Sequence, residues 1–155
     1  FTISPIGRAT SIDQLFLTAT QYKQLMEMIL QLKQRAGMEI NLSESGYLGD
    51  CYEHRVRNHP YFCRAGINVA GIMVNGDILA CPNIDRRFAQ GNIHRDDFVE
   101  VWEKKYDQFR NRSWMKQGPC TQCDSWRRCQ GNGMHLWDLD NNRPRLCHLR
   151  DYELE

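Results

Sequence analysis

The pattern of apolar and polar positions is clearest near the start of the chain, where it predicts one helix over 17–37. Apolar residues recur there every three or four positions and share one helix face: Tyr22, Leu25, Ile29, Leu32 and Ala36. Thr18 and Gln21 form a capping box that predicts where the helix begins. Gly37 predicts where it ends.

Two short extended runs, over 1–7 and 38–44, flank this helix and predict a β/α/β unit over 1–45. Such a unit usually belongs to a larger parallel sheet or barrel. The chain begins at Phe1 rather than at a methionine, which indicates a piece of a longer protein. We therefore expect the rest of that barrel to precede Phe1.

A change of character follows residue 45. Residues 46–63 show no regular period, and Asn75-Gly76 then separates two apolar runs within 67–81. This dipeptide predicts a β-hairpin with a two-residue type I′ turn, which would set Cys81 opposite Ala70.

A second helix is predicted over 95–112, with Asp97 and Glu100 capping its start. Its apolar face would carry core residues: Phe98, Val101, Trp102 and Phe109. A helix–strand mixture of this kind predicts an α+β fold.

Composition narrows the classes of partner and compartment. The 155 residues hold 20 Lys and Arg against 19 Asp and Glu, for a net charge of +1. This balance gives no electrostatic basis for binding nucleic acid or an anionic membrane. No apolar run approaches the ~20 residues of a membrane span, and no signal peptide opens the chain. We expect a cytoplasmic, reducing environment.

Seven cysteines are a high and odd number, which argues against a secreted disulfide framework. Four of them have the spacing of metal ligands: Cys120, Cys123, Cys129 and Cys147. Two residues between the first pair of thiols allow a tight turn to aim both at one centre. Four thiolates suit zinc or an iron–sulfur cluster. The alternative is that these cysteines are buried as small apolar residues.

The other three cysteines, Cys51, Cys63 and Cys81, form a looser set that predicts a second metal site. Three thiolates do not complete a four-coordinate site, so a fourth ligand is needed. The candidates are an acidic group, water, substrate or a histidine: His54, His135 or His148. Alternatively, these thiols are incidental.

The spacing Cys63-x12-Gly76-x4-Cys81, followed by the four-cysteine set, resembles the SPASM domain. This is the C-terminal auxiliary-cluster domain of many radical S-adenosylmethionine enzymes. The segment "GNIHRDDFVEVW" is similar to the region that links the two clusters in that family. The resemblance implies a SPASM-like domain over 46–155, with a hairpin and short helices, after the end of a partial TIM barrel over 1–45. It also implies a 4Fe–4S cluster on Cys120, Cys123, Cys129 and Cys147, and most of another on Cys51, Cys63 and Cys81.

The sequence departs from the family pattern at two positions. The family has a cysteine three residues after Cys129, where this chain has Gly133. His135 is the first substitute ligand to consider. Sulfatase-maturing relatives have an acidic residue after the cysteine that corresponds to Cys81, where this chain has Pro82. No catalytic residue is therefore carried over.

The resemblance implies that the chain supports electron transfer and binds a peptide or protein substrate within an oxidoreductase. The CxxxCxxC motif that cleaves S-adenosylmethionine is absent, so that cofactor and a third cluster would belong to the upstream barrel, and this piece alone would be inactive. The alternative function is a structural zinc-binding interaction module, and zinc could also replace iron in an isolated piece.

Overall fold

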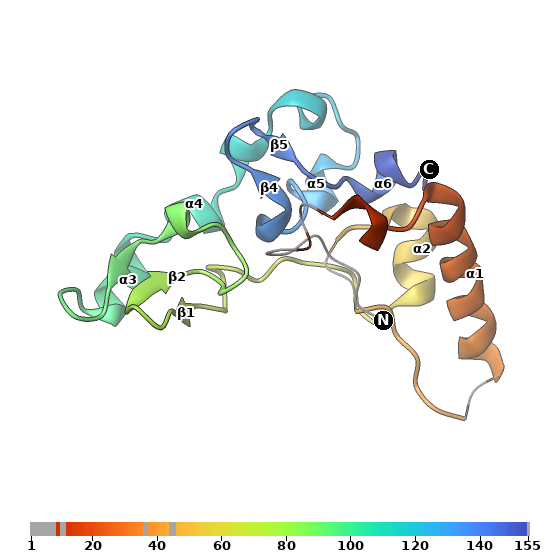
Figure 1. Cartoon of the computed structure of the whole chain (residues 1–155), viewed down its shortest axis with the longest axis horizontal. Helices are drawn as coiled ribbons and strands as arrows, with labels where there is room; N and C mark the ends of the chain where they lie inside the picture. Colours follow the sequence, from red (N-terminus) through yellow and green to blue (C-terminus); the bar gives the residue numbers. More distant parts are fainter. Residues whose placement is uncertain (1–8, 10–11, 36, 44–45, 155) are drawn as a thin grey trace.

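The computed structural model describes residues 9, 12–35, 37–43 and 46–154 (Figure 1). The described part is an α+β fold of short helices and two small antiparallel sheets. Its α-helices are α1 (Ala19–Arg35), α2 (Gly49–Val56), α3 (Phe98–Lys104), α4 (Asp107–Arg110), α5 (Trp126–Cys129) and α6 (His148–Asp151). Its strands are β1 (Gly71–Ile72), β2 (Asp77–Leu79), β3 (Gly91–Asn92), β4 (Trp137–Asp138) and β5 (Arg143–Pro144). Short 3-10 helices connect them: η2 (Asp13–Leu15), η3 (Arg86–Phe88), η4 (Ser113–Met115), η5 (Gly118–Cys120) and η6 (Met134–Leu136).

Buried side chains gather in two cores. The hairpin core consists of Ala65, Ile78, Leu79, Ala80, Ile84, Phe88, Val101, Tyr106, Phe109, Met115, Met134 and Trp137. The α1–α2 core consists of Tyr22, Met26, Ile29, Leu42, Tyr47, Leu48, Val56, Leu149, Tyr152 and Leu154. The C-terminal segment over 126–154 supplies residues to both cores and lies between the hairpin and α1 (Figure 1).

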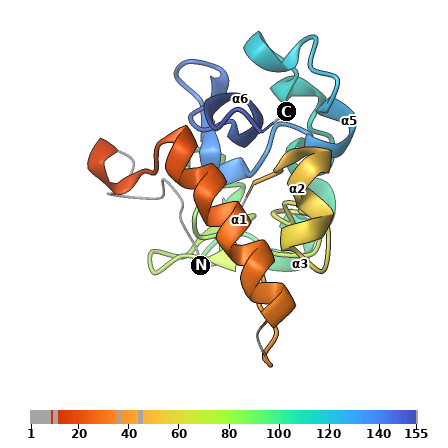
Figure 2. The ribbon, with the colours of Figure 1, turned by 90° about the vertical axis from the view of Figure 1, so that its right-hand side faces the viewer.

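The first predicted helix is confirmed as α1. The backbone N–H of Gln21 donates to the Thr18 hydroxyl, and the N–H of Thr18 donates to the Gln21 side chain, so the capping box is reciprocal. The buried face carries Tyr22, Met26 and Ile29, whereas Leu32 is exposed. α2 packs beside α1, as Figure 2 shows, although the sequence around α2 gave no regular period.

The predicted strand over 38–44 is wrong for 38–43, which have an irregular backbone. The other flanking strand, over 1–7, lies outside the described residues. Leu42 is buried, and its N–H donates to the carbonyl of Val56 at the end of α2. A strand needs a neighbouring strand for its ladder bonds, and this segment meets a helix end instead. The described part therefore contains no β/α/β unit.

The predicted hairpin is present, but its turn differs by one residue. β1 and β2 pair with Gly71 opposite Leu79, and β3 pairs with β2 on the other side. The N–H of Gly76 donates to the carbonyl of Met73. Of the two residues predicted to form the turn, Gly76 has a left-handed φ, of 87°, and Asn75 does not. A type I turn followed by a left-handed glycine gives a three-residue loop, so the register shifts from the predicted one.

The predicted helix over 95–112 is two helices, α3 and α4. Asp97 caps α3 as expected, accepting from the N–H of Glu100 at 2.8 Å. The helix is interrupted between Lys104 and Asp107, where the Tyr106 hydroxyl points inward and donates to the carbonyl of Leu79 at 2.9 Å. The Arg110 guanidinium then donates to the carbonyl of Trp102 at the end of α3. A side chain thus satisfies a carbonyl that a continuous helix would have bonded.

No helix among the residues described here combines the length and the apolar character that crossing a membrane requires.

Candidate metal centre

Four cysteines line one cavity between α5 and α6. Cys120 ends η5, Cys123 follows it in a turn, Cys129 ends α5, and Cys147 immediately precedes α6. The cavity has a volume of about 290 Å³, and its other walls include Pro119, Trp126 and Leu149. The structure therefore brings together the four thiols that the spacing grouped as metal ligands.

Tight turns place the first three thiols. The N–H of Cys123 reaches the carbonyl of Cys120 at 3.5 Å, and the N–H of Trp126 donates to Cys123 at 3.0 Å. The loop therefore folds back before α5 begins. α5 ends at Cys129 because the next three residues, Gln130, Gly131 and Asn132, have left-handed φ angles of 47°, 80° and 70°.

Asn132 joins this turn to the fourth cysteine, a role that the sequence did not reveal. Its side chain is 3 % exposed and donates to the carbonyl of Leu146, the residue before Cys147, at 3.1 Å. Its Oδ1 accepts from the N–H of Tyr47 at 3.2 Å. At the start of α6, the N–H of Cys147 donates to the Asp151 carboxylate at 2.8 Å. The spacing between the Cys129 and Cys147 segments is thus set by protein hydrogen bonds.

The four thiols interact electrostatically, which confirms their proximity. Burial raises the pKa of Cys129 to about 12, with further repulsion from Cys147, Cys120 and Cys123. Burial, with the charges of Cys147 and Cys123, raises the pKa of Cys120 to about 11. The Arg150 guanidinium acts in the opposite direction on Cys120 and Cys147. Without a bound cation, Cys120 and Cys129 therefore keep their protons at neutral pH.

Four thiolates are the ligand set of one zinc ion and of an iron–sulfur cluster alike. Within the described residues, no three His, Cys, Asp or Glu side chains are placed to hold a single metal ion. Zinc binds thiolate sulfur at about 2.3 Å, which draws four sulfurs to roughly 4 Å from one another. An iron–sulfur cluster takes one thiolate at each of several irons and so keeps its sulfurs further apart. The lining of the cavity supplies four cysteines as candidate ligands of such a cluster.

Two cysteines of the looser set lie together, and the third lies apart from them. Cys63 and Cys81 pack against the hairpin core, and the Cys63 charge adds to burial in raising the pKa of Cys81. Cys51 is exposed on α2, at the opposite side of the molecule from β2 (Figure 1). The structure therefore brings Cys63 and Cys81 together and holds Cys51 apart from them.

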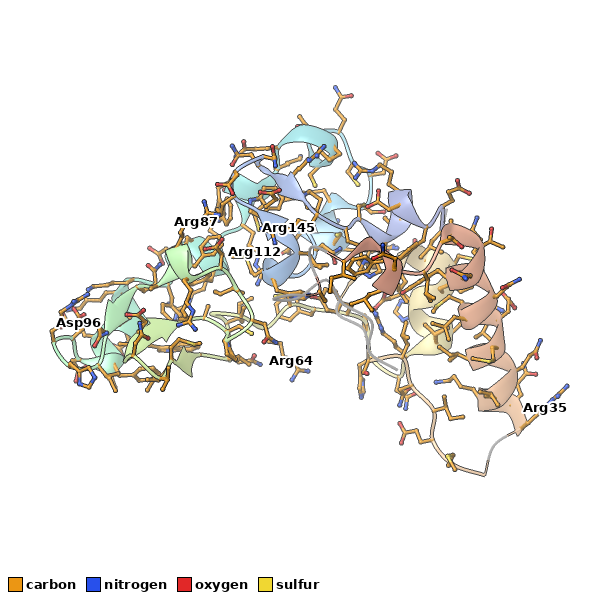
Figure 3. All side chains as sticks on the ribbon, viewed as in Figure 1. Arg35, Arg64, Arg87, Asp96, Arg112 and Arg145 are labelled. Atoms are coloured by element: carbon orange, nitrogen blue, oxygen red, sulfur yellow. The ribbon has the colours of Figure 1, made fainter. Side chains whose placement is uncertain are left out.

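Arg112 fixes the backbone around Cys63. It lies at the junction between the part of the chain that holds the hairpin and the C-terminal segment (Figure 3). This arginine is 4 % exposed and donates to the carbonyl of Cys63 at 2.9 Å and to that of Ala65 at 3.3 Å. Like Asn132, it gave no signal in the sequence, because a lone Arg is usually a surface residue.

The three candidate histidines lie in different surroundings. His54 is exposed on α2. His148 is buried, with its Nδ1 3.2 Å from the Asn132 amide nitrogen and its ring beside Tyr22. His135 lies on η6, where it and Tyr61 fill the space next to Gly133. Only His135 is thus near the Cys63 region.

Comparison with known proteins gives one match. Residues 63–124 match the family model of SPASM, an iron-sulfur cluster-binding domain. The matched segment begins at Cys63, contains Cys81 and Cys120, and ends just after Cys123. Searches of curated proteins and of solved structures found no significant match to the chain.

Proposed function

Because residues 63–124 of this chain are a SPASM iron–sulfur cluster-binding domain, we propose that it serves as the auxiliary-cluster domain of a radical S-adenosylmethionine enzyme. The ligands of its main cluster would be Cys120, Cys123, Cys129 and Cys147. The observation that carries this assignment is their convergence on one cavity. A bound 4Fe–4S cluster would supply one-electron transfer.

The residues around the cavity fit the demands of that cluster. Thiolates are the ligand form, so assembly must release the protons that burial holds on Cys129 and Cys120. The Arg150 guanidinium faces the negative charge that results and offsets part of it. Apolar walls from Trp126 and Leu149 limit access of water, which helps to set the reduction potential.

The parent reaction and its substrate are proposed from the resemblance to the family. A peptide or protein substrate would be modified by a radical generated elsewhere, since no CxxxCxxC motif occurs in the sequence. The chain would then contribute electron transfer and part of the substrate-binding surface, in an oxygen-poor, reducing cytoplasm.

Anaerobic purification of the full polypeptide tests the assignment. We expect a brown protein with broad absorbance near about 400 nm and with iron and sulfide in equal amounts. Cys120→Ser and Cys147→Ser should each lower the iron content, whereas Thr121→Ala, an exposed control in the same loop, should not. A colourless protein with one zinc per chain would instead support the structural zinc module.

A further inference from the structure

A second group of polar side chains, which we call the Cys63 corner, lies around Cys63 and outside the four-cysteine cavity. The thiol of Cys63 accepts from the backbone N–H of Met134 at 3.5 Å. It also forms a hydrogen bond with the side chain of Tyr61 and is close enough to Cys81 for their charges to repel. Residues from three distant stretches, near 61–63, 81 and 133–135, therefore meet here.

Gly133 shows which side chains occupy the centre of this corner. A Cβ built on Gly133 would lie 2.6 Å from Cε1 and 2.9 Å from Nδ1 of His135, and 2.8 Å from the Tyr61 hydroxyl. All three distances are too short for a real Cβ, so a side chain at 133 would displace both rings. The imidazole and the phenol thus fill the space into which a cysteine at 133 would extend.

A buried ion pair holds Tyr61 in place. The Glu53 carboxylate accepts from the backbone N–H of Tyr61 and pairs with Arg57 at 2.7 Å. The Arg57 guanidinium in turn lies over the Tyr61 ring, 5.5 Å from its centroid. The Tyr61 side chain also forms a hydrogen bond with Cys63, in which the phenol hydroxyl donates to the sulfur.

We propose that His135 replaces the missing cysteine and binds, with Cys63 and Cys81, a second iron–sulfur cluster whose Cys63 sulfur accepts a hydrogen bond from Tyr61. This proposal rests on the proposed function, since it requires a chain that acquires iron–sulfur clusters. Imidazole is an established alternative to thiolate in such centres and raises their reduction potential. Cys51 takes no part, because it is exposed on α2 and does not pack with Cys63 and Cys81 against the hairpin core.

The test uses the full polypeptide, reconstituted anaerobically with iron and sulfide, reduced, and measured by pulsed EPR. Histidine ligation predicts a strong ¹⁴N coupling that is lost in His135→Ala and His135→Cys. His135→Ala should lose about half of the bound iron, because one of two clusters loses a ligand. His135→Cys should keep the iron and show a lower reduction potential. Tyr61→Phe should keep both iron and ¹⁴N coupling, with a lower potential as well.

Two variants serve as matched controls. His54→Ala removes an exposed histidine and Cys51→Ser an exposed cysteine, both on α2, and neither should change the iron content or the ¹⁴N coupling. Unchanged ¹⁴N coupling in His135→Ala would overturn the proposal, as would an iron content that responds to Cys120→Ser but not to Cys63→Ser. Absence of iron from every variant, wild type included, would instead contradict the proposed function itself.

Discussion

Asn132 offers the most direct test of how the cysteine cavity is built. Its side chain bonds the N–H of Tyr47 and the carbonyl of Leu146, and its backbone is left-handed, with a φ of 70°. Asn132→Ala leaves both groups without their partner, which costs on the order of 1 kcal/mol each. Alanine also tolerates the left-handed conformation less well, at roughly 1 kcal/mol. We expect a total loss of about 3 kcal/mol in the free energy of unfolding.

The assay is urea unfolding of the metal-free, reduced protein, followed by tryptophan fluorescence. Asn142→Ala is the matched control: Asn142 also has a left-handed φ, of 49°, but is exposed. It should lose only the roughly 1 kcal/mol of the backbone effect. The difference between the two variants therefore measures the hydrogen bonds of Asn132 alone.

A second measurement on the same variants connects stability to the site. Asn132 sets the separation of the Cys129 and Cys147 segments, so Asn132→Ala should also bind less iron on reconstitution, while Asn142→Ala should match the wild type. If the two variants unfold at the same urea concentration and take up equal iron, Asn132 does not organise the cavity and the reasoning fails.

Three further predictions concern other parts of the molecule. The substitution Gly133→Ala should lower the free energy of unfolding by about 1–3 kcal/mol, because the new Cβ clashes with His135 and Tyr61. The cost should be smaller in a His135→Ala background, and an equal cost in both backgrounds would refute the packing described. In the metal-free protein at pH 8, Cys129 should react with iodoacetamide more slowly than exposed Cys51 by a factor of more than about ten. Because the pKa of Cys129 is raised to about 12, its alkylation rate should keep increasing as the pH rises toward this value. Mass spectrometry of the alkylated peptides would measure this rate, and a plateau near about pH 9 would contradict the prediction. Tyr106→Phe removes the buried bond to Leu79 and should cost about 1 kcal/mol in denaturant unfolding, a cost that equal midpoints would disprove.

Elements governed by neighbouring residues were predictable from the sequence. The capping box of Thr18 and Gln21 starts α1, Asp97 starts α3, and Asn75-Gly76 makes the hairpin turn. The SPASM resemblance likewise depended on local cysteine spacing, and the family match supports it.

Features governed by distant partners were not predictable. Tyr106 divides the expected helix over 95–112 because its hydroxyl reaches Leu79, far away in the sequence. The segment at 38–43 meets the end of α2 instead of a strand, which no periodicity reveals. Asn132 and Arg112 are polar residues whose importance comes from burial, and burial is a property of the whole fold.

The stretch from Cys129 to Cys147 has a mechanical consequence, because both of its ends pack against the α1–α2 core while its middle belongs to the hairpin core. Met134 and Trp137 belong to the hairpin core, whereas Leu149 and Tyr152 belong to the α1–α2 core. A rigid inorganic group bound at both ends of this stretch would close it into a loop anchored on the α1–α2 core, with Met134 and Trp137 held in the hairpin core. Loss of that group would open the loop, so we expect the contact between the two cores to loosen when the cofactor is removed.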